Sequence, residues 1–160
     1  MVYKYSLSVS GDNFNPEVII KSVQWDFLIG TFFKPSDAKS INNSETYGYG
    51  SLAFWHPKKF SSEKNVSTYE NDFVEFVEKN YHIFIENFVT DFEIYIEIYF
   101  DSSECNFEIF NRALLKRLAP LGMALPISVY VLSTEKLQKW EMEINEVWRG
   151  TPLSDEESQG

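Results

Sequence analysis

The sequence has few of the residues that disulfides, metal sites and redox centres require. Among its 160 residues it has a single cysteine, Cys105, and two histidines, His56 and His82. One cysteine excludes an internal disulfide framework and is compatible with a reducing compartment. Neither histidine has a second His or Cys at the spacing of a metal motif. We therefore expect no metal and no other cofactor, both histidines on the solvated surface, and Cys105 as buried filler.

Long apolar runs are also missing. The longest candidate, FEIYIEIYF, is interrupted by Glu93 and Glu97 and is far shorter than the ~18 residues that cross a bilayer. The first residues, MVYKYSLSVSG, alternate polar and apolar side chains and lack the apolar core of a signal peptide. These absences predict a soluble, cytoplasmic protein that has no membrane partner.

Positive charge is scarce, with 14 Lys+Arg against 24 Asp+Glu and a formal net charge of -10. The imbalance is concentrated in residues 70–104, where ten acids accompany one basic residue, Lys79. An acidic surface repels the phosphates of nucleic acids and attracts basic proteins. We therefore exclude nucleic acid as the partner and favour a basic protein, although the same charge also serves to keep an aromatic-rich domain in solution.

Motifs of catalytic sites are absent too. There is no Gly-x-Ser-x-Gly elbow, and YGYG at residues 47–50 lacks the spacing and the following helix of a phosphate-binding loop. Carboxylates on one face of a strand, such as Glu93 and Glu97, are typical of a solvated face. General acid–base catalysis would need them in an enclosing pocket. We therefore predict that the protein is not an enzyme.

The sequence is rich in residues that can form a hydrophobic core, since 44% of its residues are hydrophobic and 17% are aromatic. This length and composition predict one globular domain, which we assign to residues 1–149. Residues 150–160 are acidic and show no apolar periodicity, so we expect a disordered tail there.

Alternating polar and apolar residues predict the strands. Residues 3–10 place Tyr and aliphatic side chains on one face and Lys and Ser on the other, as in a half-buried strand. Residues 92–100 repeat the alternation, with Phe and Ile facing one way and Glu and Tyr the other. A further short strand is predicted at residues 126–133.

Caps and apolar stripes predict the helices. Asn15 followed by Pro16 is a typical helix start. Residues 72–89 carry an apolar stripe with steps of three and four, which predicts the longest helix of the chain. Asn106 is the predicted cap of a third helix, and a final helix is expected to begin near Thr134.

The chain shows an internal repeat at a shift of 91 residues, which moves Tyr3 onto Ile94. The apolar face of the first strand then falls on that of the strand at 92–100, and Asn15 falls on Asn106. We interpret this as two β-α-β halves joined by the helix at 72–89. Two such halves predict an α+β fold with one mainly antiparallel sheet and helices packed on it, in a ferredoxin-like arrangement.

Three segments occur in the order typical of a known family. They are YSLSVSGDNFNPEVI, YGYGSLAFW and CNFEIFNRALLKRLAPLGMALPISVYV. In this order they resemble the bacterial domain-of-unknown-function family numbered 4279, and the resemblance covers residues 3–132. Ser128 departs from the family pattern, which usually has an acid in the last strand. The family has no established function, but its size and acidity are similar to those of immunity proteins that neutralise secreted bacterial toxins.

The most promising surface is the polar face of the strand at 92–101. Tyrosines are typical interface anchors, and acids at a rim speed association with a basic partner. The alternative interpretation is that a helix covers this face and its tyrosines belong to the core. The residues predicted to bind the partner are Glu93, Tyr95, Glu97, Tyr99 and Asp101 from this strand, with Glu75, Glu78 and Glu86 from the helix at 72–89.

The leading hypothesis is a non-enzymatic protein-binding domain. Specifically, we expect a bacterial immunity protein that blocks a basic toxin, for example a nuclease, through this acidic, tyrosine-rich surface. The alternative is a small-molecule-binding or enzymatic domain that uses a cleft between the two halves. A self-assembling structural domain is a third hypothesis.

Overall fold

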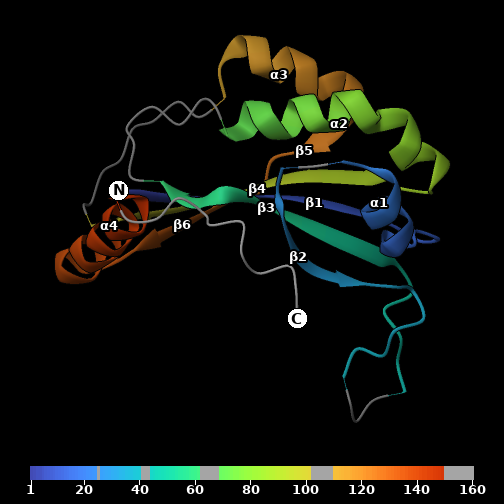
Figure 1. Ribbon diagram of the computed structural model, residues 1–160, viewed down its shortest axis with the longest axis horizontal. Helices are drawn as coiled ribbons and strands as arrows, with labels where there is room; N and C mark the ends of the chain where they lie inside the picture. Colours follow the sequence, from blue (N-terminus) through green and yellow to red (C-terminus); the bar gives the residue numbers. More distant parts are fainter. Residues whose placement is uncertain (25, 41–43, 62–68, 102–109, 150–160) are drawn as a thin grey trace.

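The computed structural model describes residues 1–24, 26–40, 44–61, 69–101 and 110–149 (Figure 1). Within these ranges the chain forms one six-stranded sheet and four α-helices. The strands are β1 (Val2–Gly11), β2 (Leu28–Phe33), β3 (Gly50–Ser61), β4 (Asp91–Phe100), β5 (Met123–Ala124) and β6 (Ile127–Val131). The helices are α1 (Pro16–Ser22), α2 (Tyr69–Glu86), α3 (Arg112–Leu118) and α4 (Thr134–Arg149), with a 3₁₀ turn, η1 (Ala119–Leu121), after α3. None of these helices is long and apolar enough to cross a membrane.

The sheet confirms the predicted α+β class. Its strand order is β2-β3-β1-β4, with β5 and β6 both on the far side of β4. Strand β1 pairs antiparallel with β3 and β4, and β2 pairs antiparallel with β3, whereas β5 and β6 run parallel to β4. The first four strands, with α1 and α2, follow the β-α-β-β-α-β order of a ferredoxin-like fold. A crossover through α3 then adds β6 to the edge.

Both β-α-β halves predicted from the repeat are present. The first is β1-α1-β2, whose two strands lie on either side of β3. The second is β4-α3-β6, whose two strands are direct neighbours. Helix α2 runs from β3 to β4 in the chain and so connects the two halves, as expected.

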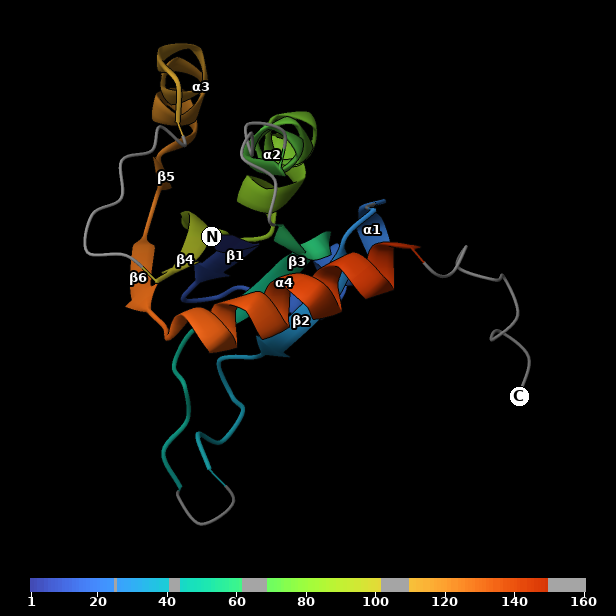
Figure 2. The ribbon, with the colours of Figure 1, turned by 90° about the vertical axis from the view of Figure 1, so that its left-hand side faces the viewer.

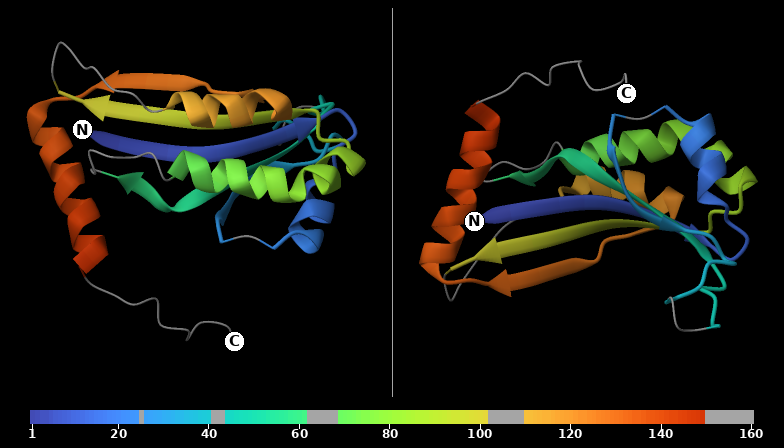
Figure 3. Two further views of the ribbon diagram at one scale, coloured as in Figure 1. Left: turned by 90° about the horizontal axis from the view of Figure 1, so that it is seen from above. Right: turned by 60° about the horizontal axis from the view of Figure 1, so that its bottom comes forward.

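The helices cover one face of the sheet and one of its ends. Figure 2 shows α1, α2 and α3 on the same side of the sheet, with α2 and α3 next to each other. Figure 3 shows α4 crossing the strand ends where β1 begins and where β4 and β6 end. We call the sheet face opposite α2 and α3 the open face, because α1, α2 and α3 all lie on the other side of the sheet. At one end the open face meets α4.

Alternation along the strands decides which side chains form the core beneath α2. On β1 and β4 every second side chain is at most 2% exposed, while the intervening ones lie on the open face. Full burial of an aliphatic side chain stabilises the fold by roughly 1.5–3 kcal/mol. The residues concerned are Tyr3, Tyr5, Leu7 and Val9 on β1, Phe92, Ile94, Ile96 and Ile98 on β4, and Phe73, Val77 and Phe84 on α2.

The starts of α1 and α4 confirm the predictions from sequence, and the bounds of α2 correct one. Asn15 caps α1 as predicted, because its Oδ1 accepts a hydrogen bond from the Glu17 amide at 3.1 Å. Helix α4 begins at Thr134, also as predicted. Helix α2 spans Tyr69–Glu86 rather than 72–89, and Phe88 just beyond it adopts a left-handed φ of 65°.

The cap of the third helix is the clearest correction. Helix α3 begins at Arg112, and Asn111 caps it by accepting a hydrogen bond from the Leu114 amide at 3.0 Å. This start places Leu114 and Leu118 in the core. The repeat therefore holds for the strands, whereas the described cap of α3 is Asn111 rather than Asn106. Asn106, the predicted cap, lies outside the described residues, as do Cys105 and the predicted tail at 150–160.

Candidate functional site

The open face carries a floor of small side chains between two aromatic ones. Ser6 on β1 is paired with Trp55 on β3 and with Tyr95 on β4, so it lies between the two rings. One pair further along, Ser8 lies between Ala53 and Glu93 in the same way. Because neighbouring strands are ~4.8 Å apart, the two flanking strands are about 10 Å from each other.

Trp55 extends this floor toward the edge strand β2. A Cβ atom added to Gly30 would lie 2.8 Å from the indole Nε1, so the ring occupies the space above that glycine. The Nζ atom of Lys4 lies 5.5 Å from the centroid of the same ring, within the range of a cation–π contact. A larger side chain at Gly30 would displace the indole.

One end of the predicted ladder is closed by internal contacts. Tyr99 stacks on Tyr130 of β6 and meets the edge of Trp140 of α4, with ring centroids 4.9 Å apart in each pair. The hydroxyl of Tyr99 donates to Glu97 Oε2 at 2.8 Å, and Lys4 Nζ lies 3.0 Å from the same oxygen. Burial and the hydrogen bond to Glu97 raise the pKa of the Tyr99 phenol. At this end the alternative interpretation, in which a helix covers the tyrosine, is the correct one.

The middle of the ladder has no such contacts. Tyr95 is 40% exposed and Glu93 is half-buried on the same face. Among the described residues no cation lies within 4 Å of Glu93, and the ring of Tyr95 makes no aromatic contact. Asp101 follows the end of β4 and is exposed. We call the centre of the open face the Tyr95 surface (Ser6, Ser8, Ala53, Glu93 and Tyr95). Tyr95 is its exposed member, and the other four are half-buried.

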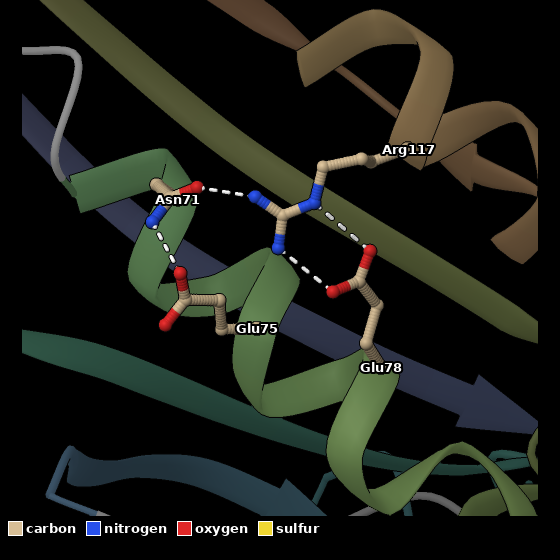
Figure 4. A network of polar contacts seen from close by, with 4 residues as sticks. All are labelled: Asn71, Glu75, Glu78 and Arg117. Carbon is tan, nitrogen blue, oxygen red and sulfur yellow. Dashed lines mark hydrogen bonds and ion pairs between the residues drawn. The ribbon is translucent and has the colours of Figure 1, made fainter. Parts of the chain in front are cut away.

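The three predicted acids of α2 lie on the other side of the sheet. Two of them help to hold α3 (Figure 4): Arg117 of α3 donates from Nε and Nη2 to the two carboxylate oxygens of Glu78, at 3.0 and 2.7 Å. The same guanidinium donates from Nη1 to Asn71, whose amide in turn donates to Glu75 Oε1 at 2.7 Å. The ion pair lowers the pKa of Glu78. Glu86 is exposed at the far end of the helix.

The predicted residues therefore do not form one continuous surface. The strand residues lie on the open face, and the helix acids lie above the opposite face (Figure 1). Within the strand set, Glu97 and Tyr99 are engaged in the contacts at the α4 end, which leaves Glu93 and Tyr95 in the centre.

The prediction that both histidines are solvated is wrong for one of them. His82 is exposed on α2, but His56 is only 7% exposed. Its ring packs 4.4 Å from that of Tyr69, and its Nε2 lies 2.9 Å from Asp72 Oδ2, a hydrogen-bonding distance. The alternation on β3 carries the signal that was missed, because Leu52 and Phe54 are core residues and His56 follows at the next position of the same face.

A pocket of about 410 Å³ opens beside His56, between the residues that follow α1, the middle of β3 and the flank of α2. The rings of Phe27 and Phe76, 5.2 Å apart between centroids, form its apolar part. The polar groups that line it are Gln24, Asp26, His56, Asp72, Glu75, Lys79 and Asn80. Spacing in the sequence gives no warning of this pocket, because its walls come from three separate segments.

A second buried ionisable group lies in the first turn of α2. Glu70 is fully buried close to the Tyr5 phenol, and among the described residues neither of its carboxylate oxygens has a hydrogen-bond partner of good geometry. Burial raises its pKa to about 7. Burial and the nearby Glu70 also raise the pKa of the Tyr5 phenol on β1. The predicted helix at 72–89 left Glu70 in a linker, so its burial could not be anticipated.

The arrangement defines an α+β protein with an open sheet face and a polar pocket beside His56. No group of three or more His, Cys, Asp or Glu side chains within the described ranges could hold a metal ion. Comparisons of the chain with protein-family models, with curated proteins and with solved structures found no match.

Proposed function

We propose that this chain is a non-enzymatic protein-binding domain whose contact area is the Tyr95 surface. The observation that carries the proposal is the contrast within the open face, whose α4 end is closed by aromatic contacts while its centre is not. An exposed tyrosine beside small side chains is suited to anchoring a partner, because it supplies contact area at a low cost in conformational entropy.

The partner expected from the charge is a basic protein. The chain has a net charge of -10, and Glu93 at the centre of the surface has no ion-pair partner among the described residues. Such a field steers a cationic protein to the surface and speeds its association, with a strong dependence on salt.

A bacterial immunity protein that blocks a basic toxin, for example a nuclease, is the specific form of this proposal. Its mechanism would be occlusion, in which the Tyr95 surface covers the cationic groups that the toxin uses to hold its substrate. No bond is made or broken. The resemblance of the three quoted segments to the domain-of-unknown-function family numbered 4279 supports a bacterial setting, and the acidity of the chain supports the choice of partner.

The proposal is tested with the protein encoded next to this one, by measuring its association rate with purified chain. Glu93→Lys is expected to slow association about tenfold at low salt, because it reverses the charge at the centre of the contact. Glu86→Lys is the matched control, since it makes the same change of charge on an exposed residue above the other face. Equal rates for the two variants, or no complex with the wild type, would sink the proposal.

A further inference from the structure

The flank of α2 that faces β2 and β3 bears an extended groove. The pocket beside His56 adjoins a second one of about 460 Å³, and the two share Gln24, Asp26 and Lys79 in their walls. The second pocket reaches Val23 at the end of α1. Helix α1 has 7 residues and is much shorter than α2, which has 18 (Figure 3, left).

The polar lining of this groove favours a positively charged ligand. Asp26, Asp72 and Glu75 contribute three carboxylates, and among the described residues Lys79 is the one lysine or arginine in the lining. Asp72 lies at hydrogen-bonding distance from His56, which fixes its position at the inner end. An anionic ligand such as a phosphate would meet these carboxylates at close range and be repelled.

The apolar lining adds a preference for an organic cation over a metal ion. Phe76 is 8% exposed, and Phe27 packs against it and against Phe73 at 4.7 Å between centroids. An ammonium or guanidinium group gains from aromatic faces as well as from carboxylates, and its methylene chain gains from apolar contact. Asn80 donates its amide to the carbonyl of Phe76 at 2.8 Å, which leaves its side-chain oxygen as an acceptor.

We infer that this groove binds an alkyl ammonium or guanidinium group, supplied either by a free amine such as a polyamine or by a Lys or Arg side chain of a protein. The methylene chain of the ligand lies against Phe27 and Phe76, and its cationic end lies near Asp72 and Glu75. The site is on the helix side of the sheet and does not depend on the function proposed for the Tyr95 surface.

The test is calorimetric titration of the purified chain with agmatine and spermidine, and with glutamate and inorganic phosphate for comparison. Saturable binding of the amines, and none of the two anions, is the expected result. An arginine-containing peptide in a further arm separates the two sources. Tighter binding of the peptide than of agmatine assigns the group to a protein, and the reverse order assigns it to a free amine.

Three variants make the inference falsifiable residue by residue. Glu75→Gln is expected to weaken amine binding about threefold to fivefold, as for a partly exposed ion pair. Lys79→Met is expected to strengthen it by a similar factor, since it removes the one repelling lysine. Glu86→Gln is the matched control, because it makes the same change of charge as Glu75→Gln on an exposed residue of α2 outside the groove.

Several results would overturn the inference. The first is that no amine binds saturably up to ~10 mM, because binding weaker than this would not indicate a specific site. The second is that glutamate or phosphate binds more tightly than the amines. The third is that Glu75→Gln and Glu86→Gln change the amine affinity equally. Circular dichroism checks that each variant is folded. Tyr95→Ala is expected to leave the amine affinity unchanged. The proposal for the groove and the proposal for the Tyr95 surface can therefore fail independently of each other.

Discussion

Strand β4 carries one pattern twice, as Glu93-x-Tyr95 and as Glu97-x-Tyr99, and the structure uses the two copies differently. The second copy is engaged in contacts within the chain. The Glu97 carboxylate contacts Lys4 and the Tyr99 hydroxyl, and the Tyr99 ring packs against Tyr130 and Trp140. The first copy faces solvent above a floor of serines. The partners that distinguish them come from β1, β6 and α4, so identical local sequence acquires a structural role in one place and an open surface in the other.

The same comparison extends to a third carboxylate. Within the described part of the chain, Glu70 is buried on the helix side with no hydrogen-bond partner for either oxygen, whereas Glu97 is paired with Lys4 and Glu93 is half-buried without an ion-pair partner. The free energy that a carboxylate contributes depends on its surroundings rather than on its neighbours in sequence. Substitutions of these three glutamates should therefore change the free energy of unfolding by amounts that differ in sign as well as in size.

The largest expected effect concerns Glu70 and pH. Its pKa is about 7 in the folded chain and near 4.5 when unfolded, so the folded state holds the proton more tightly. The free energy of unfolding should therefore fall as pH rises from about 5 to 8, by up to about 3 kcal/mol more in the wild type than in Glu70→Gln. Urea denaturation across this pH range measures the difference. Parallel pH profiles for the two proteins would show that Glu70 is not desolvated as described.

The next largest effect separates the two tyrosines. Tyr99→Ala removes two ring contacts and a hydrogen bond, and we expect it to lower the free energy of unfolding by about 2–3 kcal/mol. Tyr95→Ala should cost less than about 1 kcal/mol, because a 40% exposed ring without aromatic contacts is removed. Chemical denaturation at constant pH compares them. Equal losses would remove the distinction between the two copies of the pattern.

A smaller effect separates the two glutamates. Glu97→Gln weakens its ion pair with Lys4 and should cost about 0.5–1 kcal/mol, while Glu93→Gln should change stability by less than about 0.5 kcal/mol. Added salt should shrink the first loss and leave the second unchanged, because only the first involves an ion pair. A salt-independent difference would assign the loss at Glu97 to packing instead.

The fold was largely predictable because its strands obey a simple period. The alternation at Tyr3–Val9 and at Phe92–Ile98 predicts which side chains meet α2, and the Asn15–Pro16 pair predicts where α1 begins. The start of α3 was not predictable, because Asn106 and Asn111 are equally good caps. Only packing of Leu114 and Leu118 on the core favours the second.

The candidate sites were less predictable, because their geometry depends on contacts between distant segments. Nothing near Glu97 in sequence indicates that Lys4 will neutralise it. The groove joins the end of α1, the middle of β3 and the flank of α2, and no motif links these segments. The burial of His56 could have been anticipated from the alternation on β3, and that of Glu70 could not.

The most direct test of the account compares two tyrosines of nearly equal exposure on the open face, Tyr95 at 40% and Tyr130 at 44%. The quantity to measure is the affinity of the neighbouring gene product for Tyr95→Ala and for Tyr130→Ala. The account predicts a loss of at least about tenfold for Tyr95→Ala and less than about threefold for Tyr130→Ala. Equal losses, or a larger loss at Tyr130, would contradict the assignment of the contact to the centre of the face.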